Sequence, residues 1–278
     1  MPYAQLTDTR TYYEAAGVGP PLLLVAGLGC THDFWADVRE QLAERFALIM
    51  PDNRGIGRSA AIRPARCVRD LAADLVELLD HLQIDRVHML GHSFGGVVAQ
   101  QFAVDHSPRL DRLVLMNTAA RFGPYLEQIA RLLGQALRYF PRRQFRRTME
   151  LLGAAPEFLD AHPNWIQEKV DHPRCPPAGR GVVARQLRCL GASRCVAGPS
   201  RIAAPTLVIA SEYDSLVPHC YVRQLADSIP GSRFMLVENC GHSPLDEQPE
   251  RIVPVIADFL ADLPINHHIP VFQGATHA

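Results

Sequence analysis

Six short apolar segments recur along the chain and constrain its fold more than any other feature. Most of them are apolar throughout, without the alternation of polar and apolar side chains that marks a strand with one exposed face. Strands of this kind are buried on both faces, as in a parallel sheet covered by helices. The segments span residues 21–27, 46–52, 87–93, 113–118, 206–214 and 233–239.

Helical patterns lie between these segments. In residues 67–82, for example, regularly spaced apolar side chains fall on one stripe of a helix. Further helices are expected at 33–44, 94–105, 219–228 and 249–262, and an antiparallel hairpin at the sheet edge is expected at 10–17. The alternation of strand and helix predicts an α/β fold with a doubly wound, mostly parallel sheet.

One long stretch, residues 121–201, contains no convincing strand. Its patterns predict helices near 125–139, 143–152, 156–170 and 180–191, joined by breaks that contain proline. An irregular loop of that length is improbable inside a compact domain, so a helical insertion between two strands is the better interpretation. We therefore expect a core made of residues 1–120 and 202–262, a helical cap at 121–201, and a loosely ordered tail at 263–278, where no periodicity is present.

Charge is distributed unevenly between these parts. The cap holds thirteen arginines and one lysine against six acidic residues, and fourteen minus six gives +8. The whole chain has a formal net charge of −1, so the rest of it carries about −9. The simplest interpretation is a solvated helical surface, and the alternative is a basic wall that attracts an anionic substrate.

Length and composition argue against several classes of protein. A chain of 278 residues that is 47% hydrophobic suits one globular domain with an inserted subdomain. The nearly balanced charge argues against a nucleic-acid-binding protein. No apolar run approaches the roughly 20 residues of a membrane helix. The first ten residues lack the basic and apolar regions of a secretory signal, so we expect a cytoplasmic protein without a membrane partner. Nothing in the sequence indicates an oligomeric state.

Seven cysteines are scattered along the chain, with no C-x-x-C pair. The odd number and irregular spacing predict free thiols in a reducing compartment rather than disulfides or a metal site. Lys169 is the only lysine, and its flanking sequence is typical of a helix surface. Schiff-base chemistry and phosphate binding by a P-loop are therefore not expected, and we expect neither a cofactor nor a metal ion.

The strongest chemical signal is the sequence Gly91-His92-Ser93-Phe94-Gly95, between a predicted strand and a predicted helix. In this context the pattern G-x-S-x-G forms a sharp turn that exposes the serine hydroxyl at the carboxyl edge of the sheet. The N-terminus of the following helix favours negative charge that develops there. Ser93 is therefore predicted to be a nucleophile.

A serine hydroxyl needs a base, and the base needs an acid that orients it. His242 lies between the last predicted strand and the last predicted helix, and Asp214 ends the strand at 206–214, so both belong to the same edge of the sheet. Glu212 lies within that strand end and is expected to point elsewhere. We predict a triad of Ser93, Asp214 and His242, in that chain order.

Acyl transfer also requires hydrogen-bond donors for the charged oxygen of the tetrahedral intermediate. The backbone N–H of Phe94, directly after the nucleophile, is one expected donor. The other is the backbone N–H of Leu28, in a loop where Gly27 and Gly29 permit a close approach.

Together these segments resemble the α/β-hydrolase superfamily across nearly the whole chain. The matching sequences are AGLG, DNRGIGRS (52–59), GHSFGG, SEYDSLVP and GHSPLDEQPE. The resemblance implies an eight-stranded, mostly parallel sheet with a helical cap inserted after strand six, and the insertion at 121–201 fits that cap. A serine at the turn distinguishes the chain from the haloalkane dehalogenases and epoxide hydrolases of the superfamily, which carry aspartate there.

One loop departs from the common pattern of the superfamily. Ala26 stands where histidine is usual. In this respect the chain is similar to 3-oxoadipate enol-lactonases and related small hydrolases, whose loops also lack that histidine. Their loops carry a tryptophan a few residues later, and Trp35 is the corresponding residue here. Because the expected donor is a backbone group, the missing histidine should not abolish the oxyanion site. We expect Gly27, Trp35 and Trp165 to line the substrate pocket.

The sequence therefore predicts a serine hydrolase that cleaves a carboxylic ester or lactone through an acyl-enzyme. Ser93 attacks the acyl carbon, His242 accepts its proton and later activates water, and Asp214 holds His242. Two alternatives stay open: a carbon–carbon bond hydrolase of a ring-cleavage product with the same triad, and a slow-turnover ligand receptor on the same fold. The sequence does not identify the small-molecule substrate, nor which cap arginines face inward toward an anionic one.

Overall fold

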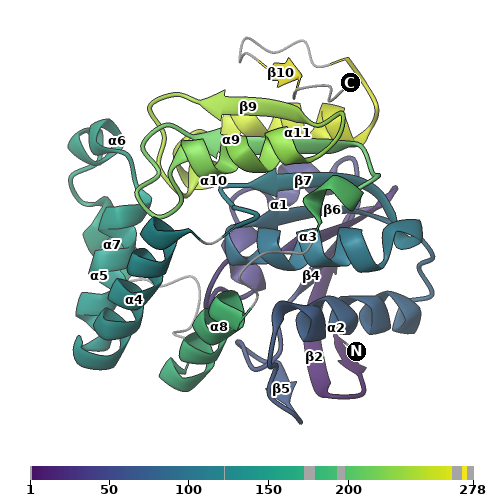
Figure 1. Ribbon diagram of the computed structural model, residues 1–278, viewed down its shortest axis with the longest axis horizontal. Helices are drawn as coiled ribbons and strands as arrows, with labels where there is room; N and C mark the ends of the chain where they lie inside the picture. The colour runs from purple at the N-terminus through teal and green to yellow at the C-terminus, as the bar shows by residue number, and fades with distance from the viewer. Residues whose placement is uncertain (1, 122, 172–178, 193–197, 265–270, 274–278) are drawn as a thin grey trace.

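The computed structural model describes the chain except for residues 1, 122, 172–178, 193–197, 265–270 and 274–278. A ten-stranded sheet runs through it in the order β1-β2-β4-β3-β6-β7-β8-β9-β10, with β5 paired to β2 (Figure 1). Its strands are β1 (Tyr3–Gln5), β2 (Thr9–Ala16), β3 (Pro21–Val25), β4 (Ala47–Pro51), β5 (Ala60–Ala61), β6 (Val87–His92), β7 (Leu110–Met116), β8 (Thr206–Ser211), β9 (Arg233–Val237) and β10 (Val271–Gln273).

The six apolar segments form the parallel centre of this sheet, from β4 through β3, β6, β7 and β8 to β9. The pairs β1–β2, β2–β4 and β9–β10 are antiparallel. The predicted α/β fold with a mostly parallel sheet is confirmed. The expected eight strands are all present, and the short strands β5 and β10 are additional.

Helices cover both faces of the sheet, because successive residues of a strand point to opposite sides. Leu22 and Leu24 pack on one face with apolar side chains of α1 and α11. Leu23 and Val25 pack on the other face with α2, α3 and α9. These helices are α1 (Arg39–Ala43), α2 (Val68–His81), α3 (Phe94–Asp105), α9 (His219–Ser228) and α11 (Pro249–Leu260), and the short helix α10 (Pro244–Glu247) precedes α11.

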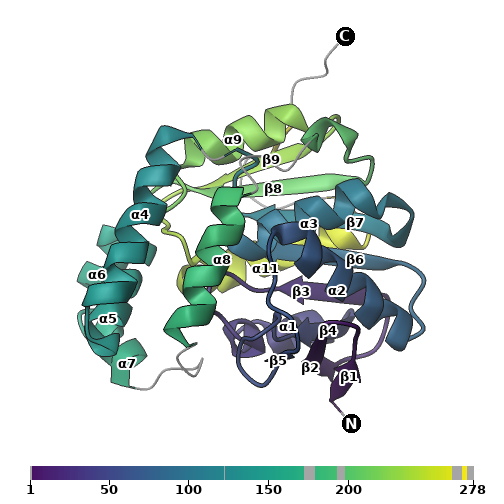
Figure 2. The same cartoon turned by 60° about the horizontal axis from the view of Figure 1, so that its bottom comes forward.

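The cap segment, residues 121–201, lies between β7 and β8, and its described helices gather at one side of the sheet (Figures 1 and 2). They are α4 (Pro124–Tyr139), α5 (Arg142–Gly153), α6 (Pro156–Ala161), α7 (Trp165–Asp171) and α8 (Arg180–Ala192). The single helix expected at 156–170 is two helices, because Pro163 removes a backbone N–H and disfavours helical geometry in the residue before it.

The structure also tests the expectations for the edge hairpin, the C-terminal tail and the cysteines. The hairpin expected at 10–17 begins earlier in the chain: residues 10–16 belong to the single strand β2, and its hairpin partner is β1, with Tyr3 opposite Tyr12. The loose tail expected at 263–278 lies mostly outside the described residues, but Val271–Gln273 differs from that expectation by forming β10. Cys67, Cys189, Cys220 and Cys240 are free thiols, and Cys175 and Cys195 lie outside the described residues. No helix in the described ranges is long and apolar enough to cross a bilayer.

Candidate active site

Ser93 occupies a strained turn between β6 and α3. Its backbone has φ 52° and ψ −119°, a conformation that residues with a side chain rarely adopt. The turn is tight because α3 packs directly on the sheet: a Cβ atom on Gly95 would lie 2.0 Å from the carbonyl oxygen of Val25. The predicted strand, turn and helix around Ser93 are therefore all present.

His242 and Asp214 form a buried hydrogen-bonded pair. The Nδ1 atom of His242 lies 2.7 Å from Oδ2 of Asp214. The other oxygen of Asp214 accepts hydrogen bonds from the backbone N–H groups of Leu216 at 2.9 Å and Val217 at 2.8 Å. Because a carboxylate only accepts, His242 donates from Nδ1, which leaves Nε2 free to accept a proton.

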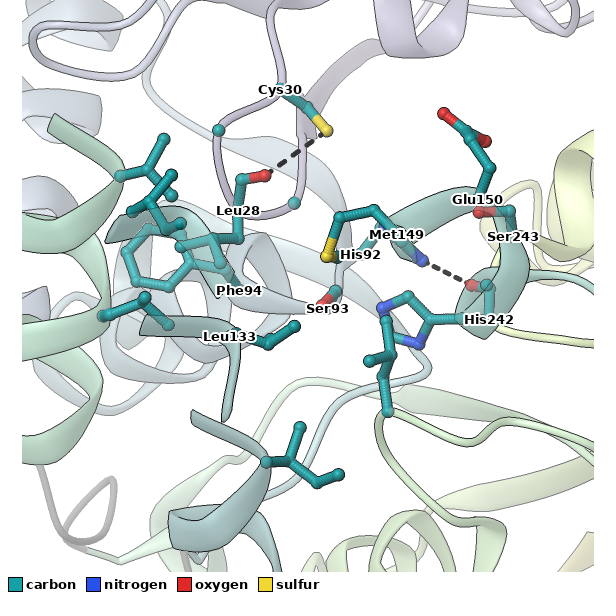
Figure 3. A pocket seen from close by; sticks show the side chains of 18 of the residues that line it. Leu28, Cys30, His92, Ser93, Phe94, Leu133, Met149, Glu150, His242 and Ser243 are labelled. Carbon is teal, nitrogen blue, oxygen red and sulfur yellow. Dashed lines mark hydrogen bonds between the residues drawn. The ribbon is translucent and has the colours of Figure 1, made fainter. Parts of the chain in front are cut away.

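Ser93 and His242 line the same cavity (Figure 3). Both belong to the described residues, and the structure has no hydrogen bond between their side chains. Catalytic hydrogen bonds are often long in proteins without substrate and shorten only when substrate binds. The arrangement brings the predicted nucleophile, base and acid to the carboxyl ends of β6, β9 and β8.

Glu212 points away from this pair, as expected. Its Oε2 atom accepts the backbone N–H of Asn239 at 2.9 Å. Of the other histidines, His219 is exposed at the start of α9. His88 is half-buried in β6, where burial lowers the pKa of its imidazole.

Leu28 and Phe94, whose backbone N–H groups are the predicted oxyanion donors, both line the cavity. Neither donates a hydrogen bond to another group in the part of the chain that the structure describes. The next amide along, that of Gly29, does have a partner: it donates to Oε1 of Gln186 at 2.8 Å. The amides of Leu28 and Phe94 are thus both available to bind a negatively charged oxygen.

Gln186 was not predicted as a site residue. It belongs to α8 of the cap, its side chain is buried, and its hydrogen bond to Gly29 fixes the loop that carries Leu28. Sequence alone offers no signal for this role, because a glutamine within an amphipathic helix has the same pattern whether it faces solvent or another loop.

Glu247 was also not predicted. Its carboxylate accepts the backbone N–H of Gly241, next to His242, at 3.0 and 3.2 Å, and the N–H of Ala155 in the cap at 3.2 Å. Burial raises the pKa of Glu247 to about 7. Glu247 therefore joins the loop that carries His242 to the cap.

The cavity has a volume of about 470 Å³ and lies between the core and the cap. Its walls are mainly apolar around Ser93, where α4 contributes Leu126, Leu133 and Leu137 and α8 contributes Val183, Leu187 and Leu190. Gly27 lines it as expected. In Figure 3, Leu133 and Met149 reach toward the cavity from the cap.

Two of the three predicted pocket residues do not line this cavity. Trp35 is completely buried in the core beneath the sheet, and its neighbour Phe34 lines the cavity instead. Trp165 packs edge-on against Phe158, and the ammonium group of Lys169 lies over its ring. The prediction failed for both tryptophans because a sequence does not indicate which side of a short helix faces a cavity.

Lys169 is not the surface residue that its flanking sequence suggests. Its side chain is only 11% exposed and lines the cavity, with Nζ 2.9 Å from Oδ1 of Asp246 and 4.1 Å from the ring centre of Trp165. Arg146 is paired with Glu150 at 3.5 Å, also on the cavity wall. One end of the cavity therefore combines basic and acidic groups.

The charged wall as a whole is more basic than acidic. Its members are Arg142, Arg143, Arg146, Lys169 and Arg180, against Glu150 and Asp246. Among the described residues, no group of three or more His, Cys, Asp or Glu side chains is placed to hold a metal ion.

Comparison with known proteins gives relatives of the same architecture. The chain is 28% identical to the "Putative carbamate hydrolase RutD" of Azorhizobium caulinodans over 243 residues, which is 87% of this chain and 92% of the relative. A thermophilic esterase of Thermogutta terrifontis is 30% identical with a TM-score of 0.81, and the match covers 94% of this chain and 98% of the esterase.

An enol-lactonase of Burkholderia xenovorans LB400 has the same fold. Its TM-score is 0.84 at 24% identity, over 94% of this chain and all of the lactonase. The family model described as the alpha/beta hydrolase fold matches residues 20–249. This match includes the turn at Ser93, the cap and the pair formed by Asp214 and His242, and the chain therefore belongs to the alpha/beta hydrolase family.

Proposed function

We propose that the protein is a serine hydrolase that cleaves a carboxylic ester or lactone through an acyl-enzyme. The observation that carries this proposal is the strained Ser93 in one cavity with the hydrogen-bonded pair of His242 and Asp214. A strained nucleophile beside an oriented histidine is the arrangement that acyl transfer requires.

In the proposed reaction, Oγ of Ser93 bonds to the acyl carbon while its proton passes to Nε2 of His242. The oxyanion of the tetrahedral intermediate accepts hydrogen bonds from the N–H groups of Leu28 and Phe94. The departing alcohol takes the proton from His242. Water then attacks the acyl-enzyme, with His242 accepting its proton and returning it to Ser93 as the acid leaves.

The walls of the cavity suggest the kind of substrate. The apolar side chains of α4 and α8 around Ser93 suit an apolar acyl or alcohol group. The charged wall suits a polar or anionic group farther from the ester, and Lys169 is its most buried cation. We therefore propose a small ester with an apolar body and an anionic end.

Two other hydrolytic activities use the same machinery. A carbamate is a candidate because RutD, to which the chain is similar, is named for that reaction. A carbon–carbon bond hydrolase of a ring-cleavage product is a candidate because the charged wall could hold the substrate's carboxylate. A slow-turnover receptor would keep the cavity and bind ligand with little hydrolysis.

Turnover measurements separate these functions. We expect the protein to hydrolyse p-nitrophenyl acetate and butyrate, and the variant Ser93→Ala to lose this activity. A p-nitrophenyl carbamate and a vinylogous 1,5-diketone acid test the two alternatives. Faster cleavage of either would replace the ester proposal, and binding of all of them without turnover would support a receptor.

We also propose that residues 1–120 and 202–262 form the catalytic core and residues 121–201 its cap, in a protein of the cytoplasm. The placement of α4–α8 between β7 and β8 supports this division. The free thiols of Cys67, Cys189, Cys220 and Cys240 support a reducing compartment.

A further inference from the structure

Two buried side chains donate hydrogen bonds to one backbone oxygen, the carbonyl of His242. The Nε2 atom of His92 lies 2.8 Å from this oxygen, and Nδ2 of Asn117 lies 3.0 Å from it. Figure 3 shows the first of these bonds as a dashed line between His92 and His242. The mechanism proposed above uses neither side chain.

The sheet brings the two donors together. His92 is the last residue of β6, and Asn117 directly follows β7, whose final residue, Met116, pairs with His92. Both donors therefore stand at the carboxyl edge, beneath the loop that carries His242. The contact spans 150 positions of sequence from His92 and 125 from Asn117.

His92 is held as a neutral donor with a fixed ring. Its imidazole stacks on Phe34 at 4.7 Å between ring centres and lies 4.8 Å from the ring of His242. Because a carbonyl only accepts, Nε2 carries the hydrogen. Complete burial, with the nearby His242 as a second cause, lowers the pKa of His92 to about 3, so the ring stays neutral at ordinary pH.

Asn117 makes its contacts from the left-handed backbone region, which is uncommon for residues with a side chain but is adopted most readily by asparagine and aspartate. Its φ is +48°, its side chain is fully buried, and Oδ1 has no partner among the described residues. The Nδ2 group also lies 2.9 Å from Oγ of Ser211 and 3.3 Å from the carbonyl of Gly241. Strained and partly unsatisfied residues persist where the surrounding structure over-determines them, and they cluster at functional sites.

We propose that His92 and Asn117 are positioning residues that fix the main chain of His242. Asp214 anchors the imidazole through Nδ1, and these two donors anchor the backbone that carries it. With both ends held, Nε2 of His242 can be kept at the distance that proton transfer from Ser93 requires. The inference rests on the proposed function, because it assigns His242 as the base.

The first test compares two substitutions at His92. His92→Phe keeps a flat ring in the stacked position but removes the donor, whereas His92→Gln keeps an N–H group near the position of Nε2. We expect His92→Phe to lower kcat on p-nitrophenyl butyrate by about 10-fold to 100-fold with little change in KM. His92→Gln should restore most of the loss. Equal kcat for the two variants would overturn the proposal.

The second test uses Asn117→Gly, which tolerates the positive φ and removes the other donor. We expect it to lower kcat in the same way. Because both donors bind one oxygen, the double variant with His92→Phe should lose less than the product of the two single losses. A fully multiplicative loss, or no loss from Asn117→Gly, would contradict a shared role.

A chemical probe distinguishes an effect of each substitution on folding from an effect on the position of His242. The rate at which diisopropyl fluorophosphate inactivates each variant reports the reactivity of Ser93, and the midpoint of thermal unfolding reports the fold. We expect slow inactivation of His92→Phe at temperatures where it remains folded. Normal inactivation with a lowered midpoint would mean a structural role only. If Ser93→Ala keeps full activity, the proposed function fails first, whatever the His92 variants do.

Discussion

The Oε1 atom of Gln186 accepts a hydrogen bond from the backbone N–H of Gly29 at 2.8 Å, between residues 157 positions apart. The bond joins helix α8 of the cap to the loop that holds the amide of Leu28. A second contact of this kind is made by Glu247, which joins Ala155 of the cap to Gly241, the residue before His242. The cap therefore contacts both loops that the proposed reaction needs.

Replacing Gln186 should impair catalysis more than binding. Gln186→Met has a similar length but no acceptor, so the N–H of Gly29 loses its partner and the loop can shift. We expect a loss in kcat of about 10-fold, since small displacements of oxyanion donors are costly. Gln186→Glu keeps the acceptor and should retain most activity.

Arg188→Gln provides the matched control, because Arg188 is exposed on the same helix. It should leave kcat and KM unchanged on p-nitrophenyl butyrate. If Gln186→Met matches this control, the cap does not set the geometry of the loop.

Ser93→Ala should lower kcat by several orders of magnitude, because only the oxyanion donors and binding remain. Alanine fills the same turn, so the unfolding midpoint should stay close to that of the original protein. The measurement is steady-state hydrolysis of p-nitrophenyl butyrate by carefully purified variant. Retention of more than about a tenth of the activity would rule out Ser93 as the nucleophile.

Asp214→Asn should leave Ser93 in place but favour the wrong tautomer of His242. An amide in this position can donate to Nδ1, which then no longer orients the imidazole as a base. If the loss known for the same change in chymotrypsin transfers, kcat should fall by about 10⁴. Glu212→Gln is the control, because Glu212 binds the N–H of Asn239 and not His242. A larger loss at Glu212 than at Asp214 would reverse the assignment of the acid.

Much of the fold could be predicted because its signals are local. The unbroken apolar segments indicated the parallel strands, and the pattern G-x-S-x-G from Gly91 to Gly95 indicated the turn at Ser93. The division of 156–170 into two helices was missed, although Pro163 marks the break. Strand β10 was missed because three residues carry too little pattern to identify a strand.

The supporting contacts of the site could not be predicted, because they join residues far apart in sequence. Nothing near Gln186 indicates that it meets Gly29, and nothing near Lys169 indicates that its partner is Asp246. Lys169 was misjudged for a further reason: a lysine can bury its stem and its ammonium together when a carboxylate and an aromatic ring surround it.

Glu247 should make stability depend on pH. Its pKa is raised to about 7 from an ordinary value of 4.5, first by burial, and the charges of Asp246 and Asp214 contribute in the same direction. The folded state therefore holds this proton more tightly than the unfolded state. The resulting stabilisation is complete below about pH 4.5 and is lost as pH rises through about 7.

Glu247→Gln removes this titration and keeps the size of the side chain. We expect the free energy of unfolding of the original protein, relative to this variant, to fall between pH 4.5 and pH 7.5 in urea titrations. Glu238→Gln, at an exposed position after β9, is the control and should show no such trend. If the free energies of unfolding of the original protein and Glu247→Gln changed in parallel with pH, Glu247 would not be a buried carboxyl group with a raised pKa.

The charged wall of the cavity should select substrates with an anionic end, and Lys169 should contribute most. Its ammonium is nearly buried on the cavity wall, so salt should screen it less than an exposed arginine. A carboxylate-bearing p-nitrophenyl ester should then have a higher kcat/KM than its methyl-capped analogue, and added salt should erode only part of the difference. Lys169→Met should reduce this preference, whereas Arg147→Met removes the same charge from an exposed position whose side chain binds Gln167 and does not line the cavity. Equal kcat/KM for the two esters at low salt would show that the basic residues behind the +8 charge of the cap are ordinary surface residues. If Lys169→Met and Arg147→Met reduced the preference equally, long-range charge, rather than contact with Lys169, would attract the substrate.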